Sequence, residues 1–459
     1  MKYIKILIIS VLLTGLVSCE KELDLQPQQS ISIDAATATP ENVNAILLEA
    51  YDIGRNTSPD NVAPLYFGLY SGQINIAIDL LGNTDQVSWN GTFSNLRDLF
   101  NKALINDNLS ALNFYADSYA MIGHVNTVLA NLDKFEDTSE QNRVEGEAKF
   151  LRGLIYFDMV RVFGQQYNPG GNNSQLGVPI VLLPPDVSRA VPRDTVEDVY
   201  AQVISDLTDA ASLLPASNGA RADRYAALAV LARVYLQQSN FAAARDAANE
   251  VLQDSGHTLT ATYAEAFDTD DNPIETIFSW VVTVQEGTNE SNTHYATQAL
   301  GGRGGDIAVT QTYLDKFDTP TDQRRNFTYP GEGVSDGFTL TSKFARQFAN
   351  ATHIRIAEMH LIRAESNFRL GTSVGLPPLD EINALRARSS APPLAALTLD
   401  LILNERELEL AFEGFTLHDY KRTQRDIGGL SWDDNRLVFP IPQSARDRNP
   451  LLEQNPGYN

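Results

Sequence analysis

Cysteine is almost absent from this chain of 459 residues, because Cys19 is the only one. A single thiol cannot form a disulfide within the chain, and a cysteine-based metal site needs several thiols. Histidine is also scarce, with six residues, and no HExxH pattern occurs, so the sequence does not support zinc catalysis. We therefore expect no cofactor and no metal, and a fold that rests on packing.

Long apolar runs and positive charge are lacking as well. Nothing after the first 20 residues approaches the roughly 18 consecutive apolar residues of a transmembrane helix. The chain carries 58 acidic against 35 basic residues, for a net charge of -23. Nucleic acids and anionic membrane surfaces both attract lysine- and arginine-rich patches. The composition thus predicts an acidic body that binds no nucleic acid.

The N-terminus has the layout of a secretory signal. Two lysines precede the apolar run Ile6–Val17, and the small residue Ser18 follows it. The 12 residues of the run are too few to span a bilayer core of about 30 Å. The sequence LVSC, which ends at Cys19, also resembles the bacterial lipobox, where cleavage before the cysteine leaves a lipidated thiol. We predict that residues 1–18 are removed and that Cys19 carries a lipid anchor.

Helical periodicity dominates the rest of the chain. In Val191–Pro215 the apolar residues recur at spacings of three and four, with Thr195 as the N-cap and Pro215 ending the helix. A second series of apolar residues with helical spacing runs from Leu151 to Phe163, and Gly164 ends it. Both patterns predict helices with one buried face.

Several of these helices are predicted to form pairs. Arg224–Leu252 contains two helices around a short turn and resembles a tetratricopeptide unit, with alanines at the positions where the helices approach. A second pair is predicted over Ile354–Gly371 and Leu379–Ser389, and a third joins the helices near Leu151 and Val203. We expect a mainly α scaffold of stacked helix pairs, interrupted by long loop-rich insertions with short strands.

No linker divides the chain, so residues 19–459 are expected to form one compact unit, with an N-terminal part at 19–255 and a C-terminal part at 256–459. The insertions Tyr51–Leu109 and Gly256–Ala349 are rich in polar residues, glycine and aromatics. Long loops on a rigid scaffold usually carry function. We therefore look for the ligand site in these insertions.

Motifs with catalytic associations have structural explanations here. The GTSVG at 371–375 follows a predicted helix and not the strand that a nucleophile elbow requires. The DTDDN at 268–272 lacks the glycine and glutamate of an EF-hand, and the GGRGGD at 301–306 lacks the lysine of a phosphate loop. The charged run Glu405–Glu409 lies in a predicted helix, where charges pair with one another or face water.

Five segments together carry a family resemblance. The chain resembles the SusD/RagB family of nutrient-binding outer-membrane lipoproteins over nearly its whole length. The segments are GEAKFLRGLIYFDMVRVFG (146–164), LGVPIVL (176–182), VPRDTVEDVYAQVISDL (191–207), LNERELELAFEGFTLHDYKR (403–422) and FPIPQSARDRNPLLEQNPGY (439–458).

The resemblance implies a binding protein and not an enzyme. Members of the family are helical lids on a TonB-dependent (SusC-like) transporter in the outer membrane. They capture oligosaccharides, or less often peptides, outside the cell and deliver them to the barrel. Two alternatives stay open: the same scaffold could present peptides, or the protein could be adhesive with no small ligand.

Aromatic residues are the candidates for sugar contact, because a sugar ring stacks on them while amides and charges bond its hydroxyl groups. Trp89 stands between polar residues and is the first candidate, although it could equally anchor a loop. Trp280 lies in an apolar run and is expected in the core. Tyr70 could likewise belong to a helix core. The candidate ligand-binding residues are Trp89, Asn90, Gln86, Tyr70, Tyr295, Arg303 and Trp432.

Overall fold

The computed structural model describes residues 33–55, 68–185, 190–284 and 288–458. The predicted signal peptide and Cys19 lie outside these ranges.

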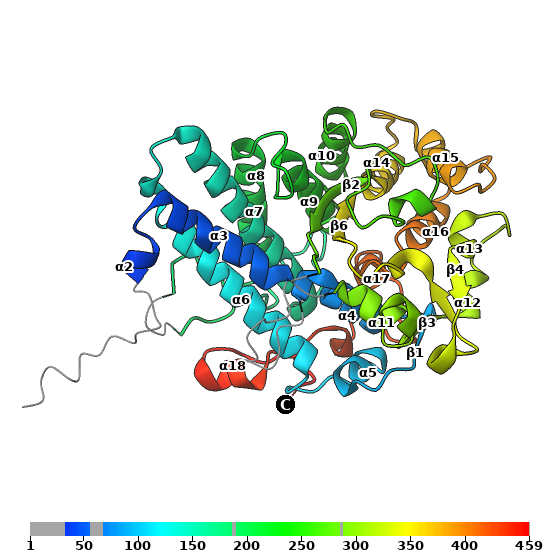
Figure 1. The fold of residues 1–459 in the computed structure, drawn as a ribbon, viewed down its shortest axis with the longest axis horizontal. Coiled ribbons are helices and arrows are strands. Elements are labelled where there is room, and N and C mark those ends of the chain that lie inside the picture. The colour runs from blue at the N-terminus through cyan, green and yellow to red at the C-terminus, as the bar shows by residue number, and fades with distance from the viewer. Residues whose placement is uncertain (1–32, 56–67, 186–189, 285–287, 459) are drawn as a thin grey trace, which may run out of the picture.

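Long helices packed in pairs form the scaffold (Figure 1). α3 lies along α6, α7 packs on α8, and α9 packs on α10, which in turn contacts α14. α14 then pairs with α15. The bounds are α3 (Pro40–Arg55), α6 (Leu109–Leu129), α7 (Thr138–Phe163), α8 (Val196–Leu213), α9 (Arg224–Gln237), α10 (Phe241–Asp254), α14 (Ile356–Leu370) and α15 (Pro378–Arg388).

These elements confirm the predicted helix pairs. Thr195 caps α8, since its hydroxyl accepts a bond from the Asp198 N–H at 3.1 Å, and α8 ends two residues before Pro215. α7 and α8 pack closely because Gly153 faces Leu207, where a Cβ would lie 2.8 Å from Leu207 Cγ. The alanines predicted at the contacts of α9 and α10 are fully buried.

Shorter helices and two small sheets complete the fold. The short helices are α2 (Ile33–Ala36), α4 (Ile74–Leu81), α5 (Ser94–Phe100), α11 (Glu290–Tyr295), α12 (Gln311–Leu314), α13 (Gln323–Asn326), α16 (Leu399–Glu409), α17 (Thr416–Arg422) and α18 (Gln443–Arg448). A π-helical turn, η2 (Leu69–Gln73), leads into α4.

The larger sheet has the strand order β1-β3-β5-β4 and lies at the right of Figure 1, away from α3 and α6. Its three-residue strands are β1 (Val87–Trp89), β3 (Ile307–Val309), β4 (Thr328–Pro330) and β5 (Thr339–Thr341). The second sheet pairs β2 (Thr276–Trp280) with β6 (Ala351–Arg355) in antiparallel fashion. The strands therefore come from the predicted insertions and from the residues beside them.

One hydrophobic cluster runs through the fold from Val43 in α3 to Tyr458 near the C-terminus. Trp280 belongs to this core, with 2% of its surface exposed, as predicted. The GTSVG segment forms the loop between α14 and α15, which also confirms the prediction.

A group of buried ion pairs holds α16 in place. Glu409 contacts Arg355, Arg388 and Arg324, and Glu405 contacts Arg324 at 2.6 Å. All these side chains are at most 4% exposed. This differs from the expectation that the charges of the run pair with one another or face water, because Glu405 and Glu409 pair with arginines from other parts of the chain.

Candidate functional site

The pairing of β1 with β3 brings two distant segments together. Trp89 lies opposite Ile307 in antiparallel register, and the Asn90 N–H donates to the Asp306 carbonyl at 2.7 Å. The glycine-rich loop at 301–306, which carries Arg303, therefore meets the segment that begins at Trp89. Three of the predicted site residues, Trp89, Asn90 and Arg303, thus lie in adjoining segments.

Aromatic rings gather at this junction. The centroid of the His294 ring lies 6.3 Å from that of Trp89 and 5.8 Å from that of Phe93. The Arg303 guanidinium lies over Phe93, 4.5 Å from the ring centroid. His294 is buried, Trp89 is half-buried, and 36% of Phe93 is exposed. Phe93 and Arg303 are the parts of this group most open to solvent.

Charged and polar groups surround the rings. The Asp306 carboxylate lies 3.0 Å from His294 Nδ1 and accepts a hydrogen bond from Arg303 Nε at 3.2 Å. Asn90 is exposed, and its side chain donates to Ser88 Oγ at 3.1 Å. We call Trp89, Phe93, His294, Arg303 and Asp306 the Trp89 cluster.

Gly91 lets the chain pass close to the Trp89 ring. A Cβ at Gly91 would lie 2.6 Å from two carbon atoms of the indole and 2.8 Å from Asp306 Cγ. These distances are far below van der Waals contact, so any side chain here would displace the ring or the carboxylate. The indole N–H is buried and has no acceptor among the described residues.

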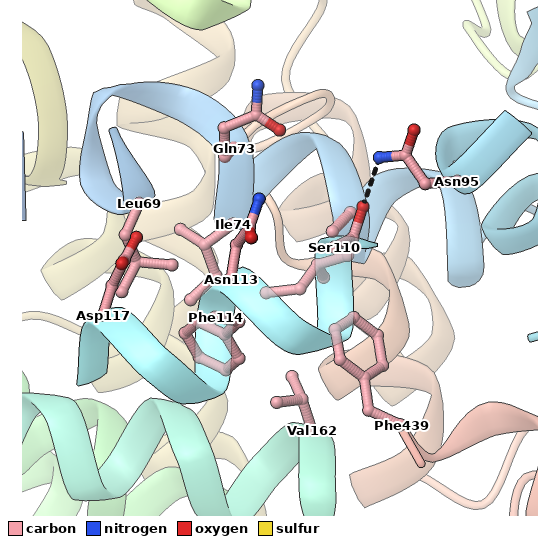
Figure 2. Close-up of a pocket in the computed structure, with 12 residues that line it drawn as sticks. Leu69, Gln73, Ile74, Asn95, Ser110, Asn113, Phe114, Asp117, Val162 and Phe439 are labelled. Carbon is pink, nitrogen blue, oxygen red and sulfur yellow. Dashed lines mark hydrogen bonds between the residues drawn. The ribbon is translucent and has the colours of Figure 1, made fainter. Parts of the chain in front are cut away.

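A pocket opens beside the start of α5 (Figure 2). Phe114, Val162 and Phe439 lie together on one side of it, and Gln73 and Asn95 lie on the other. The empty volume of the pocket is about 470 Å³ when its open mouth is included. The centre of a water-sized sphere can occupy about 30 Å³ of this space. It is lined by Leu69, Gln73, Ile74, Ala77, Ile78, Asn95, Ser110, Asn113, Phe114, Asp117, Val162 and Phe439.

α5 connects this pocket with the Trp89 cluster. Phe93 immediately precedes α5, and Asn95 is its second residue. The Asn95 side chain donates to Ser110 Oγ at 2.9 Å, and its carbonyl accepts from Asn108, the N-cap of α6. These bonds fix the start of α5 against α6, so that the rings and the pocket mouth keep their relative positions.

Comparison with known proteins identifies the family. A family model described as starch-binding and associating with the outer membrane matches residues 57–236. The model of the SusD family matches residues 211–436. This chain belongs to the SusD/RagB family.

Relatives within this family match the whole chain. The SusD-like protein P2 of Formosa agariphila is 24% identical to this chain, in an alignment that covers 100% of both sequences. A SusD superfamily structure from Bacteroides thetaiotaomicron has a TM-score of 0.81 at 24% identity, covering 91% of this chain and 100% of its own. The surface glycan-binding protein A of Bacteroides uniformis has a TM-score of 0.76 at 22% identity, covering 91% and 99%. The structures show that the SusD-like fold predicted from the sequence is correct.

Two tyrosines that we predicted to contact ligand lie in the core of this SusD-like fold. The Tyr70 ring stacks on Trp280 with 4.5 Å between centroids, and 3% of Tyr70 is exposed. Tyr295 is 1% exposed, and its hydroxyl donates to Asp79 Oδ2 at 3.3 Å. In this structure neither ring is open to a ligand, because each fills space between helices and strands. For Tyr295 this is contrary to the expectation, and for Tyr70 it agrees with the alternative of a place in the core.

The other two predicted site residues, Gln86 and Trp432, do not belong to the Trp89 cluster. Gln86 is buried, and its side chain donates to Glu407 and accepts from Thr416, so it holds β1 to α16 and α17 and does not face a ligand. Trp432 is half-buried in the loop after α17, where the Asp433 carbonyl accepts from Gln165.

Sequence reasoning missed Phe93, His294 and Asp306. Phe93 had a signal, because it lies four residues after Trp89 in the same polar segment. Asp306 ends the GGRGGD motif, for which the sequence favours a flexible loop over a phosphate loop, and neither interpretation assigns a role to the aspartate. His294 had no such signal, because its position beside Trp89 depends on the contact of α11 with β3, the strand that pairs with β1.

The described ranges contain neither a cluster of metal-ligating side chains nor a helix suited to span a membrane. Among those residues, no three His, Cys, Asp or Glu side chains come close enough together to hold a metal ion. None of the helices there combines the length and the apolar composition of a membrane span.

Proposed function

We propose that this protein is an outer-membrane lipoprotein that captures oligosaccharides and delivers them to a TonB-dependent, SusC-like transporter. The observation that carries the proposal is the Trp89 cluster. It combines aromatic rings with an arginine, a carboxylate and an exposed amide, which is the combination that stacks on a sugar ring and bonds its hydroxyl groups. On this proposal the protein binds its ligand without catalysis.

The delivery step rests on different support. A lipid on Cys19 would hold the body beside the membrane, and the acidic EKELD that begins after it resembles the family's signal for export to the outer face. Tethering raises the effective concentration of the body near a barrel, so that modest direct contacts suffice for capture. The name of the Bacteroides uniformis structure points to glycans in the same family.

A glycan array followed by titration calorimetry tests the proposal. We expect Phe93→Ala and Trp89→Ala to weaken oligosaccharide binding by about 1–3 kcal/mol, by analogy with the stacking of nucleic-acid bases on aromatic rings. Circular dichroism should show unchanged helicity, above all for Phe93→Ala, since Phe93 is the more exposed ring.

Phe241→Ala is the matched control. Phe241 also has an arginine over its ring, Arg369 at 4.7 Å, but it begins α10 on the helical scaffold. We expect its loss to leave glycan affinity unchanged. No binding of the wild-type protein on the glycan array, together with binding on a peptide array, would contradict the proposal and favour the peptide alternative. Binding on neither array would favour an adhesive role.

A further inference from the structure

Asp117 is a buried carboxyl group without a partner. It lines the pocket of Figure 2, and only 3% of it is exposed. No described residue donates a hydrogen bond or offers an opposite charge to it. Asp79 is buried to a similar degree, yet its carboxylate accepts from the Gly414 N–H at 3.0 Å and from Tyr295. Buried polar groups in folded proteins are normally bonded, so Asp117 points to a ligand.

The surroundings of Asp117 limit what that ligand group can be. Asn113, one turn earlier on α6, has an amide with no partner among the described residues. Ser110 and Asn95 bond each other at the mouth. Of the residues that line the pocket, Asp117 alone can carry a charge. The apolar part of the lining consists of Leu69, Ile74, Ala77, Ile78, Phe114, Val162 and Phe439, of which Phe114, Val162 and Phe439 lie together in Figure 2.

The pocket is also small. The 30 Å³ open to the centres of water-sized spheres is about two to three times what one water molecule needs. It therefore admits a substituent of a few heavy atoms and not a whole sugar ring. The carboxyl group of Asp117 is neutral at neutral pH, because burial raises its pKa to about 8, so it can donate a hydrogen bond.

We propose that this pocket binds the acetamido group of an N-acetylated sugar. The methyl group lies against the apolar wall, the carbonyl accepts from Asp117, and the N–H donates to Asn113. An ammonium group would fit less well, because some of its N–H donors would face apolar carbon atoms. A bare hydroxyl group would also fit less well, because it is too small to cover the apolar side chains. This inference rests on the proposed function, since it names the class of glycan.

The position of the pocket fits a ligand shared with the Trp89 cluster. Phe93 and Asn95 are two residues apart, so their Cα atoms are at most about 7.6 Å apart. On the same side of the pocket as Asn95, Gln73 donates to Glu290 of α11, the helix that carries His294. A glycan stacked on Phe93 can therefore place its acetamido group in the pocket.

Three monosaccharides that differ at one carbon test the inference on the full chain in detergent: N-acetylglucosamine, glucosamine and glucose. We expect saturation-transfer NMR to show contact at the acetamido methyl group, and titration to give about tenfold or more tighter binding of N-acetylglucosamine than of the others. Asp117→Leu should abolish the preference. Asp117→Asn should largely keep it, because the amide still donates, and Asp133→Leu on the exposed η3 turn (Leu132–Lys134) is the control.

Each contrary outcome overturns the inference. No transfer to the methyl group, equal affinity for the three sugars, or a preference that survives Asp117→Leu would each exclude an acetamido pocket. Tighter binding of glucosamine would mean a cation pocket instead. The test is separate from that of the proposed function, because oligosaccharides without acetamido groups can still bind through Phe93 when this pocket fails.

Discussion

Gly91 is the residue on which the orientation of Trp89 depends most directly. In Gly91→Ala the new methyl group would overlap the indole and the Asp306 carboxylate, so one of them must move. We expect about a tenfold loss of oligosaccharide affinity in calorimetry, with a melting temperature within a few degrees of the wild type, because Gly91 is partly exposed and lies outside the helical core.

Gly123→Ala is the control for this change. Gly123 lies within α6, and a Cβ there would meet only Pro185, at 3.5 Å. It should leave affinity unchanged and raise stability slightly, since alanine favours the helix. Unaltered affinity in Gly91→Ala would show that the position of Trp89 does not matter for binding.

Asp117 should also lower the stability of the empty protein as pH rises. Burial raises its pKa from the ordinary 3.8 to about 8 in the folded state, so unfolding above pH 4 releases a proton. The stability present below pH 4 is lost progressively up to about pH 8, by about 1.4 kcal/mol per pH unit at most. We expect urea unfolding to show Asp117→Asn equal to the wild type near pH 4 and more stable by a few kcal/mol at pH 8.

Asp79→Asn is the comparison, because burial also raises the pKa of Asp79 to about 8, while its carboxylate accepts two hydrogen bonds. Its replacement should gain less, since it disturbs those bonds. A stability difference between Asp117→Asn and the wild type that does not grow from pH 4 to pH 8 would mean that Asp117 has a partner in solution, because the comparison cancels the contributions of other titrating groups.

At the scale of the elements, local signals were predictable and long-range ones were not. The stripe in α8, its Thr195 cap and the alanines between α9 and α10 are properties of short stretches, so the sequence alone predicted them. The pairing of β1 with β3 brings together distant residues, and beside the two strands the Thr310 hydroxyl donates to the carbonyl of Asp85, which is 225 positions away. No local pattern shows such a contact, and for this reason His294 and Asp306 were missed.

The burial of individual side chains could not be predicted from the residue type either. Tyr70 and Tyr295 have the same chemistry as surface tyrosines that bind sugars, but they stack on Trp280 and bond Asp79 in the core. Glu409 likewise looks like a solvent-facing helix residue until Arg355 and Arg388 are placed around it.

Glu409→Gln tests how far the ion pairs of α16 stabilise the fold. Burial alone would raise the pKa of Glu409, but Arg388, Arg355 and Arg324 hold it well below its usual range. The neutral amide would leave these arginines without their shared carboxylate, and we expect a loss of about 3–5 kcal/mol in urea unfolding at pH 7. The wild-type advantage should diminish as pH falls below about 4.5, where the unfolded carboxylate gains its proton.

Glu140→Gln is the matched control, because Glu140 pairs with Arg143 at the surface and is 45% exposed. That pair should contribute at most about 1 kcal/mol. Similar losses in the two variants would show that burial adds nothing to the pairing of Glu409.

At the scale of the whole molecule, the proposed anchor decides where the protein works. We expect Cys19→Ala to abolish labelling by radioactive palmitate and to move the protein out of the membrane fraction, because no other thiol exists in the chain. Ser18→Ala keeps a small residue before the cysteine and should label normally. Persistent labelling of Cys19→Ala would disprove the anchor.

The contact between β1 and β3 also bears on how the chain folds. Helix pairs such as α9 and α10 join neighbouring residues and can form early, whereas strands of three residues that close so long a loop form slowly. The Trp89 cluster should therefore assemble late, after the chain has emerged beyond β3, and open first under stress. A ligand that bridges the two segments would hold that loop shut, so the filled protein should unfold and be cleaved by proteases more slowly than the empty one.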